Sequence, residues 1–197
     1  MFNFTPVVKN LLILNVGIYI IQRMLPEATY YLGLFPIGTE NFIPTQLFTN
    51  IFAHSPATWR HLIYNMISLI VFGPMLERTI GDKKFLLLFM ISGICATLLH
   101  VAYFELYLHQ PYFLLGASGA VMGVTVACAL YYPNMELMIY FLFPIKLKYL
   151  AILFIAMDVM NGFSGSSDGI AHFAHLGGAA AGLIMVLIWK GSNTNRY

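Results

Sequence analysis

Six apolar segments, each long enough to cross a lipid bilayer, constrain this chain more than any other feature of its sequence. A helix needs about 20 apolar residues to span the hydrocarbon region. The expected spans are residues 7–24, 61–80, 85–104, 113–132, 147–163 and 169–189. Charged residues make up only 9% of the chain, against about 25% in soluble domains, so it cannot cover a water-facing surface in the usual way. The sequence therefore predicts an all-α membrane protein with six transmembrane helices.

The connections between these spans contain no stretch that resembles a soluble domain, so residues 1–197 are expected to form a single membrane domain. The longest connection, residues 25–60, mixes four prolines with aromatic and leucine residues, and we expect it to lie in the membrane interface. The short apolar stretch 138–144 follows Pro133 and ends at Pro144. We expect it to be a re-entrant or interfacial segment rather than a seventh span.

Positive charges are distributed unevenly about the six spans. Eight of the ten lie at the N-terminal side, the even-numbered connections or the C-terminus: Lys9, Arg78, Lys83, Lys84, Lys146, Lys148, Lys190 and Arg196. Only Arg23 and Arg60 lie on the opposite side. Because positive residues stay on the cytoplasmic side, both termini are expected to be cytoplasmic. The net charge of +2 is too small to indicate nucleic-acid binding.

One serine and one histidine stand near the starts of two spans that both run inward from the outer face. Ser118 lies between Gly116 and Gly119 in the fourth span, and His175 lies in the sixth. An imidazole can take the proton of a hydroxyl as that hydroxyl attacks. At about 1.5 Å per residue, Ser118 is expected about 7–8 Å and His175 about 9 Å into their spans. The two side chains are therefore expected at the same depth.

Glycines at helical spacing are expected to hold the fourth and sixth spans together. Gly178 and Gly182 are one turn apart, as are Gly119 and Gly123. Small residues at this spacing let helix backbones approach closely in lipid. His175 precedes Gly178 by three residues and so lies on the same face. The predicted contact face therefore also carries the histidine.

His61 and Asn65 are four residues apart and project from one face of the second span. Their donors could stabilise the negative oxygen of a tetrahedral intermediate, alongside the backbone N–H of Ser118. The alternative is that they form hydrogen bonds between helices, as His and Asn commonly do within membranes.

Together these features resemble the rhomboid intramembrane serine proteases. The matching motifs are His61-Leu62-Ile63-Tyr64-Asn65, Glu77-Arg78 with Gly81, Gly116-Ala117-Ser118-Gly119, and Ala174-His175-Leu176-Gly177-Gly178 with Gly182. The resemblance covers nearly the whole chain. It implies a bundle around a water-accessible cavity, with Ser118 as nucleophile and His175 as general base in a dyad without a catalytic acid. His61 and Asn65 would complete the oxyanion site, and His54 would lie near its opening.

The resemblance also implies the substrate class: transmembrane segments with helix-destabilising residues, admitted past the fifth span or its neighbouring loop. The chain departs from the family at three places, and one of them is the slightly long loop from His54 to His61. Met122 stands where many members carry an aromatic residue against the catalytic histidine, and Thr45-Gln46 stands where many bacterial members carry Trp-Arg. These departures concern the packing of His175 and the anchoring of the first loop.

Three polar residues near the fifth and sixth spans have the spacing of metal ligands: Asp158, His172 and His175. A metal would need a further ligand and would occupy the base, so neither a metal nor another cofactor is expected. An acid within a span is functional by default, but Asp158 lies near the outer end where hydration is the alternative, and it is left unassigned. His172 is expected to support or solvate the site.

Two functions fit this pattern. The first is an intramembrane serine endopeptidase, and the second is a catalytically silent relative that binds transmembrane segments. The presence of both Ser118 and His175 favours the enzyme, because a binding protein has no need of the pair. The expected partners are transmembrane protein substrates and the lipid bilayer; the oligomeric state is not predicted. We expect a multi-pass protein of a bacterial plasma membrane with its active site toward the outer face.

Overall fold

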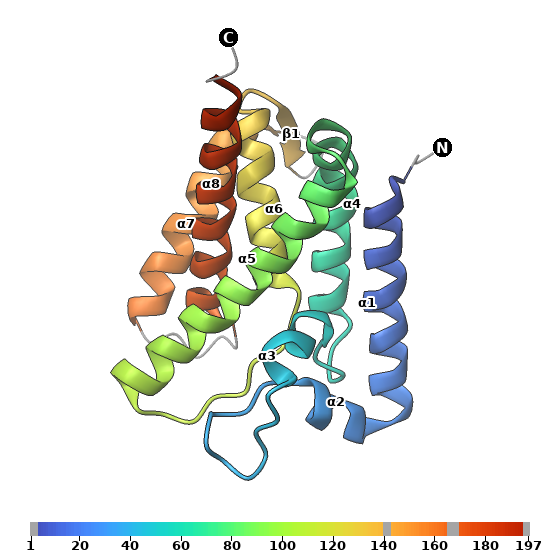
Figure 1. Cartoon of the computed structure of the whole chain (residues 1–197), viewed down its shortest axis with the longest axis vertical. Coiled ribbons are helices and arrows are strands. Elements are labelled where there is room, and N and C mark those ends of the chain that lie inside the picture. Colours follow the sequence, from blue (N-terminus) through green and yellow to red (C-terminus); the bar gives the residue numbers. More distant parts are fainter. Residues whose placement is uncertain (1–3, 140–142, 165–169, 195–197) are drawn as a thin grey trace.

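The long helices of the chain lie side by side in one bundle, and the computed structural model describes residues 4–139, 143–164 and 170–194 (Figure 1). In chain order these helices are α1 (Pro6–Met24), α4 (Arg60–Ile80), α5 (Asp82–Ala102), α6 (Ser118–Tyr131), α7 (Leu147–Ser164) and α8 (His172–Thr194). A short π-helical segment, η2 (Tyr103–Leu108), continues α5. Helix α1 begins and α8 ends at the same end of the bundle, where α4 also turns into α5.

Four of the described helices are long and apolar enough to cross a bilayer: α1, α5 continued by η2, α7 and α8. Helix α6 is apolar but has only 14 residues, and α4 has 21 residues with charged side chains near both ends. The chain is therefore a mostly helical membrane protein whose long helices follow the predicted order. That all six of them cross the membrane stays a prediction.

The connection between α1 and α4 folds into small helices at the end of the bundle opposite the start of α1 (Figure 1). They are α2 (Pro26–Leu32), α3 (Gln46–Thr49) and the 3-10 helix η1 (Asn50–Phe52). Leu34 and Leu114 exchange two backbone hydrogen bonds, of 2.8 and 3.0 Å. These bonds tie the first connection to the segment that leads into α6.

The predicted start of the fourth span is wrong, because residues 113–117 are not helical and α6 begins at Ser118. Gly116 has a φ of +133°, which only glycine adopts readily, and its N–H donates to the carbonyl of Asn50 at 2.9 Å. The backbone before Ser118 thus bonds to η1 and the first connection instead of continuing a helix.

The equal depths that the sequence predicted for Ser118 and His175 were counted from residues 113 and 169, whereas the described helices begin at Ser118 and His172. Ser118 is the first residue of α6 rather than the sixth residue of a span, and His175 is the fourth residue of α8. Residue 169, where the sixth span was expected to begin, lies outside the described residues. Both side chains nevertheless stand in the first turn of their helices.

The described residues of the stretch 138–144, which was expected to be re-entrant or interfacial, belong to an antiparallel hairpin of β1 (Glu136–Ile139) and β2 (Phe143–Lys146). Met138 is paired with Pro144 in this hairpin, and residues 140–142 lie outside the described part. Strand pairing satisfies backbone groups of the described residues of this stretch, and its place in the membrane interface stays a prediction.

The predicted glycine contact between α6 and α8 is confirmed. A Cβ atom added to Gly178 would lie 1.9 Å from the carbonyl oxygen of Gly119, and one added to Gly182 would lie 2.4 Å from that of Gly123. Helix α5 joins the same contact, because a Cβ atom on Gly119 would lie 2.3 Å from that of Ala96. Backbones approach this closely only where side chains are missing, so these glycines set the distance between the helices.

Glu77, in the last turn of α4, holds the start of α1. Its fully buried carboxylate accepts hydrogen bonds from the hydroxyl of Thr5 at 2.5 Å and from the N–H groups of Val7 and Val8 at 2.9 and 2.8 Å. The first N–H groups of a helix have no partner within it, and a carboxylate there also complements the helix dipole. Glu77 therefore fastens the first helix to the bundle.

We expect Glu77→Gln to lower the free energy of unfolding by about 1.5–3 kcal/mol, because an amide offers one acceptor oxygen and two donors to a cluster of donors. Thermal unfolding in detergent would measure this loss. The matched control is Glu27→Gln on α2, whose exposed side chain should tolerate the same change without effect. Equal stability of the two variants would show that Glu77 does not fasten α1.

Candidate active site

Ser118 lies where α6 begins, at a small pocket between four elements. The pocket is also lined by Asn50 of η1, Thr97 of α5 and Ala174 of α8. Asn50 is held in turn, because its amide donates to the hydroxyl of Thr97 at 3.2 Å and its carbonyl accepts the N–H of Gly116. The serine is therefore carried on a helix start whose preceding turn is bonded to its neighbours.

His175 follows directly after Ala174, which lines the same pocket. The carbonyl oxygen of Ala174 is 3.2 Å from the place that a Cβ atom on Gly119 would occupy. This close contact brings the first turn of α8 against the first turn of α6. The His175 side chain is 17% exposed, so it is largely shielded within the bundle. The two residues predicted as nucleophile and base are thus brought to one region.

His61, in the first turn of α4, also reaches this region. A Cβ atom on Gly116 would lie 2.4 Å from Cε1 and 2.8 Å from Nε2 of the His61 ring, so the imidazole occupies the space that a side chain at position 116 would need. Asn65 is buried, but its amide donates to the carbonyl of His61 within α4, at 2.8 Å. The structure therefore brings the His61 ring beside Gly116, two residues before Ser118. The hydrogen bond described for Asn65 stays inside its own helix.

His54 is fully buried beside His61, with the two ring centres 5.3 Å apart. Its backbone N–H donates to the side-chain oxygen of Gln22 at 2.9 Å, which joins it to the end of α1. Burial, helped by the neighbouring His61, lowers the pKa of His54 to about 4. His54 is therefore neutral at pH 7 and packs behind His61.

Gln46 anchors the first connection at the place where the chain departs from the family pattern. Its fully buried amide oxygen accepts the N–H groups of Phe35 at 3.4 Å and Ile43 at 3.1 Å. Its nitrogen donates to the carbonyls of Tyr30 at 3.2 Å and Asn41 at 3.1 Å. A neutral amide with four partners thus holds together a loop that approaches α6 through Leu34 and Leu114.

Met122 is half-buried on α6, one turn after Ser118. It is not among the residues packed against the two buried hydrophobic clusters of the described chain. Its contact with His175 stays a prediction.

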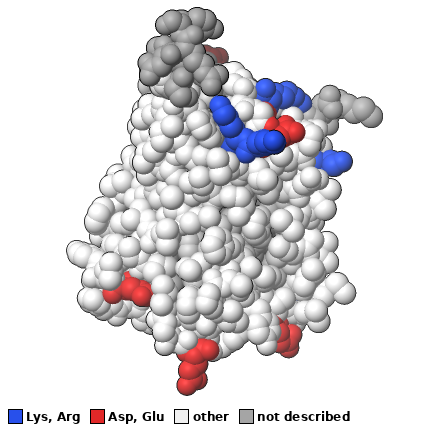
Figure 2. Space-filling view, in the orientation of Figure 1, with Lys and Arg blue, Asp and Glu red and all other residues white. Residues whose placement is uncertain are grey.

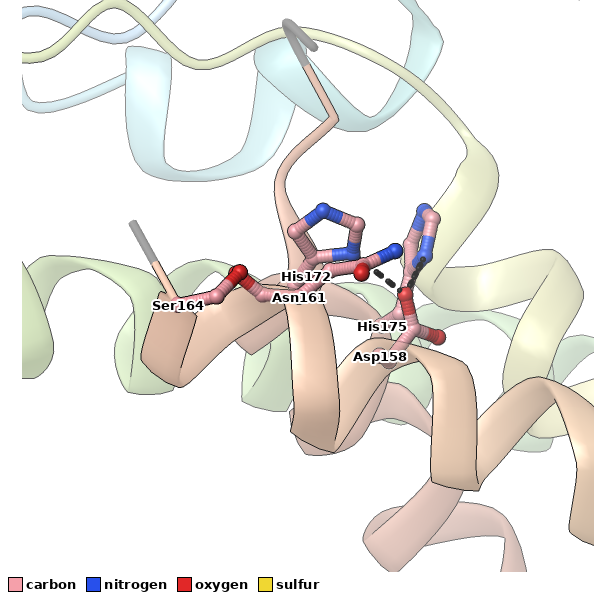
Figure 3. A network of polar contacts seen from close by, with 5 residues as sticks. All are labelled: Asp158, Asn161, Ser164, His172 and His175. Carbon is pink, nitrogen blue, oxygen red and sulfur yellow. Dashed lines mark hydrogen bonds and ion pairs between the residues drawn. The ribbon is translucent and has the colours of Figure 1, made fainter. Parts of the chain in front are cut away.

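Asp158 of α7 was left without a role from the sequence, and the structure places it between two histidines of α8 (Figure 3). Its Oδ1 atom lies 2.8 Å from Nδ1 of His172 and 3.0 Å from Nδ1 of His175. The Asp158 side chain is only 8% exposed, so the alternative of simple hydration is wrong. An acid within an apolar helix was the signal available in the sequence, but nothing there identified its partners.

These three residues are also the group that could hold a metal ion, since one ligand atom of each lies within 4.8 Å of the others. Two imidazoles and a carboxylate suit zinc when a further ligand completes the shell. A metal held through both Nδ1 atoms would replace the hydrogen bonds to Asp158. The sequence-based expectation of no metal is not tested by these contacts.

A larger pocket adjoins the network at His172. It lies between η2 and the neighbouring ends of α7 and α8, and its lining includes Tyr103, Asn161 and His172. The polar network thus borders this more open space through His172.

Comparison with known proteins gives one consistent match. The family model described as "Rhomboid domain" matches residues 43–191. RHOMBOID-like protein 12, mitochondrial, of Arabidopsis thaliana is 31% identical over 97% of this chain and 60% of its own length. Rhomboid protease AarA of Providencia stuartii is 31% identical over 69% of this chain and 52% of its own length. Rhomboid protein 1, mitochondrial, of Saccharomyces cerevisiae is 28% identical over 88% of this chain and 50% of its own length. The chain spans about half to three fifths of the length of these relatives.

Proposed function

Because this chain belongs to the rhomboid family, we propose that it is an intramembrane serine endopeptidase that cuts peptide bonds in or near transmembrane segments of other membrane proteins. One of its relatives is named a rhomboid protease. The observation that carries the proposal is the contact between the first turns of α6 and α8, where Ala174 meets Gly119 beside the pocket of Ser118.

In the proposed reaction, the Ser118 hydroxyl attacks the scissile carbonyl and His175 takes its proton. His175 then gives that proton to the leaving amine, which leaves an acyl-enzyme ester on Ser118. A water molecule, deprotonated by the same imidazole, hydrolyses the ester. No cofactor takes part in these steps.

The negative oxygen of the tetrahedral intermediate needs donors. The N–H of Ser118 suits this role, because it belongs to the first residue of α6 and the first N–H groups of a helix have no partner within that helix. His61 is the second candidate, since its ring lies against Gly116. Asn65 would have to turn its amide away from the His61 carbonyl to take part.

Substrate entry is proposed along α7. This helix contacts α6 and α8. Most of its apolar side chains are nevertheless not covered by the rest of the protein, including Ile152, Met157 and Met160. A substrate would approach along this exposed surface while Asp158 keeps α7 bonded to His172 and His175 of α8. The pocket beside η2 offers a route for the water that hydrolysis requires.

We further propose that all six long helices cross the membrane, with both termini cytoplasmic and the active site toward the outer face. Figure 2 supports this orientation: on the face shown, Lys and Arg gather at the end of the bundle where α1 begins and α8 ends. A wide band without charge separates that end from the acidic residues at the other. Two of the relatives are mitochondrial by name, so the prediction of a bacterial plasma membrane is not supported.

Labelling with a fluorophosphonate tests the proposed nucleophile directly, because the probe reacts with an activated serine. We expect the purified wild-type protein to be labelled and Ser118→Ala not to be. Ser92→Ala is the matched control, since Ser92 is a fully buried serine of α5 and its loss should leave labelling intact. A folded wild-type protein that is not labelled would favour the catalytically silent, segment-binding relative.

A further inference from the structure

We propose that Asp158 is a positioning residue for the general base His175, so that the site works as a serine, histidine and aspartate rather than as a dyad. This inference rests on the proposed function and assigns Asp158 a role in the same active site. It is carried by a buried carboxylate on α7 whose Oδ1 atom lies within hydrogen-bond distance of Nδ1 of both His175 and His172 (Figure 3).

The hydrogen bonds determine where the imidazole protons sit. An ionised carboxylate only accepts, so each Nδ1 atom must carry a proton to donate to Asp158. A neutral His175 with its proton on Nδ1 has a free lone pair on Nε2. Figure 3 shows that this second ring nitrogen points away from Asp158. Asp158 thus selects the tautomer that leaves Nε2 able to accept a proton.

The same contact supports the charge that develops during attack. The Ser118 proton moves to Nε2 of His175, while the Nδ1 proton stays in its hydrogen bond, so Asp158 remains ionised throughout. The resulting imidazolium has a carboxylate oxygen 3.0 Å from its Nδ1 atom. With Asp158 only 8% exposed, water weakens this attraction little. The proton is later released from Nε2 to the leaving amine.

His172 has a different part in the arrangement. It stands one turn before His175 and donates to the same Oδ1 atom, so it holds the carboxylate from the other side. A carboxylate in an apolar helix requires such donors. Since Asp158 comes from α7 and both histidines come from α8, the orientation of the base depends on how α7 packs against α8.

The test is a set of three variants assayed for cleavage of a model transmembrane substrate and for the rate of fluorophosphonate labelling. We expect Asp158→Asn to lower kcat by at least about tenfold, and by up to the roughly 10⁴-fold known for such an aspartate in soluble serine proteases. KM should change by less than about threefold, because no substrate contact is lost. Asp158→Glu, which keeps the acceptor, should recover part of the rate. His172→Gln, which keeps a donor beside Asp158, should lower kcat by less than Asp158→Asn.

Nitrogen NMR of histidine-labelled wild-type protein gives a second measurement that does not require the variants to fold. We expect the neutral His175 ring to carry its proton on Nδ1. A ring protonated on Nε2 would overturn the proposal. So would an Asp158→Asn protein with wild-type kcat, or a His172→Gln protein that loses as much activity as Asp158→Asn.

The alternative use of the same three side chains, a metal site, is separated by a chelator. We expect EDTA to leave the cleavage rate unchanged. Activity that EDTA removes and zinc restores would overturn the proposal in favour of metal binding. A wild-type protein that neither cleaves nor labels would refute the proposed protease function, whereas an active wild type with an unaffected Asp158→Asn variant would refute only the role of Asp158.

Discussion

Ser118→Ala and His175→Ala are each expected to lower the rate of substrate cleavage by about 10⁶-fold, the loss found when the serine or the histidine of a serine protease is removed. Because the two groups act in one step, the double variant should be no slower than either single variant. Ser118→Ala removes one hydroxyl at the pocket, so its thermal unfolding temperature should change little, whereas His175→Ala removes one of the two histidine donors to the buried Asp158 and should unfold at a lower temperature.

The control for these variants is Ser164→Ala at the end of α7. The Ser164 hydroxyl is exposed and donates to the carbonyl of Asn161 at 3.0 Å, close to Asp158 and the two histidines (Figure 3). Ser164 is not among the residues that line the pocket of Ser118. Full activity of Ser164→Ala is expected. An inactive Ser164→Ala protein together with an active Ser118→Ala protein would show that Ser118 is not the nucleophile. Additive losses in the double variant would mean that Ser118 and His175 act separately.

The order of the long helices and their glycine contact could be predicted because both depend on local patterns. Apolar length gives the helices, and the four-residue spacing of Gly178 and Gly182 gives the contact face. The start of α6 could not be predicted in this way. It depends on hydrogen bonds from Gly116 to Asn50 and between Leu114 and Leu34, partners that are 66 to 80 residues away in the chain.

Prediction of the site shows the same division. Ser118 and His175 could be recognised because each lies within a short glycine-containing motif of consecutive residues. Asp158 lies 17 residues before His175 on another helix, and only the crossing of α7 and α8 brings the two together. The i, i+3 spacing of His172 and His175 was visible, but it does not reveal which helix faces them. For Asn65, helical spacing indicated a face of α4 correctly, but not that its amide bonds back to its own helix.

The packing of α8 against α6 leads to the second large effect, which we expect for Gly178→Ala. The added methyl carbon would lie 1.9 Å from the carbonyl oxygen and 2.6 Å from the carbonyl carbon of Gly119. These are backbone atoms of a helix, so they cannot swing aside as a flexible side chain would, and the two helices must separate. Overpacking of this kind destabilises proteins by about 1–3 kcal/mol, sometimes more.

Activity should fall further than stability alone explains, because Gly178 lies one turn after His175 and Gly119 directly follows Ser118. Separating the helices at this contact therefore separates the base from the nucleophile. A displacement of about 1 Å can lower the rate by about 10²-fold, and we expect a loss of at least that size in protein that remains folded. Cleavage assays at a temperature well below unfolding would measure it.

Two other glycines of α8 allow the predicted effect to be compared between positions with different contacts. Gly191→Ala is the matched control, since no atom of the described residues outside its own stretch of helix lies within 4 Å of its added methyl group, and it should behave as wild type. Gly182→Ala should lie between the two variants: its methyl group would meet the carbonyl oxygen of Gly123 at 2.4 Å, but one turn farther from His175. The order Gly178, Gly182, Gly191 from most to least damaging follows from contact distance and from distance to the base. If Gly178→Ala were as active and stable as Gly191→Ala, the close approach of α6 and α8 would not be what holds Ser118 and His175 together.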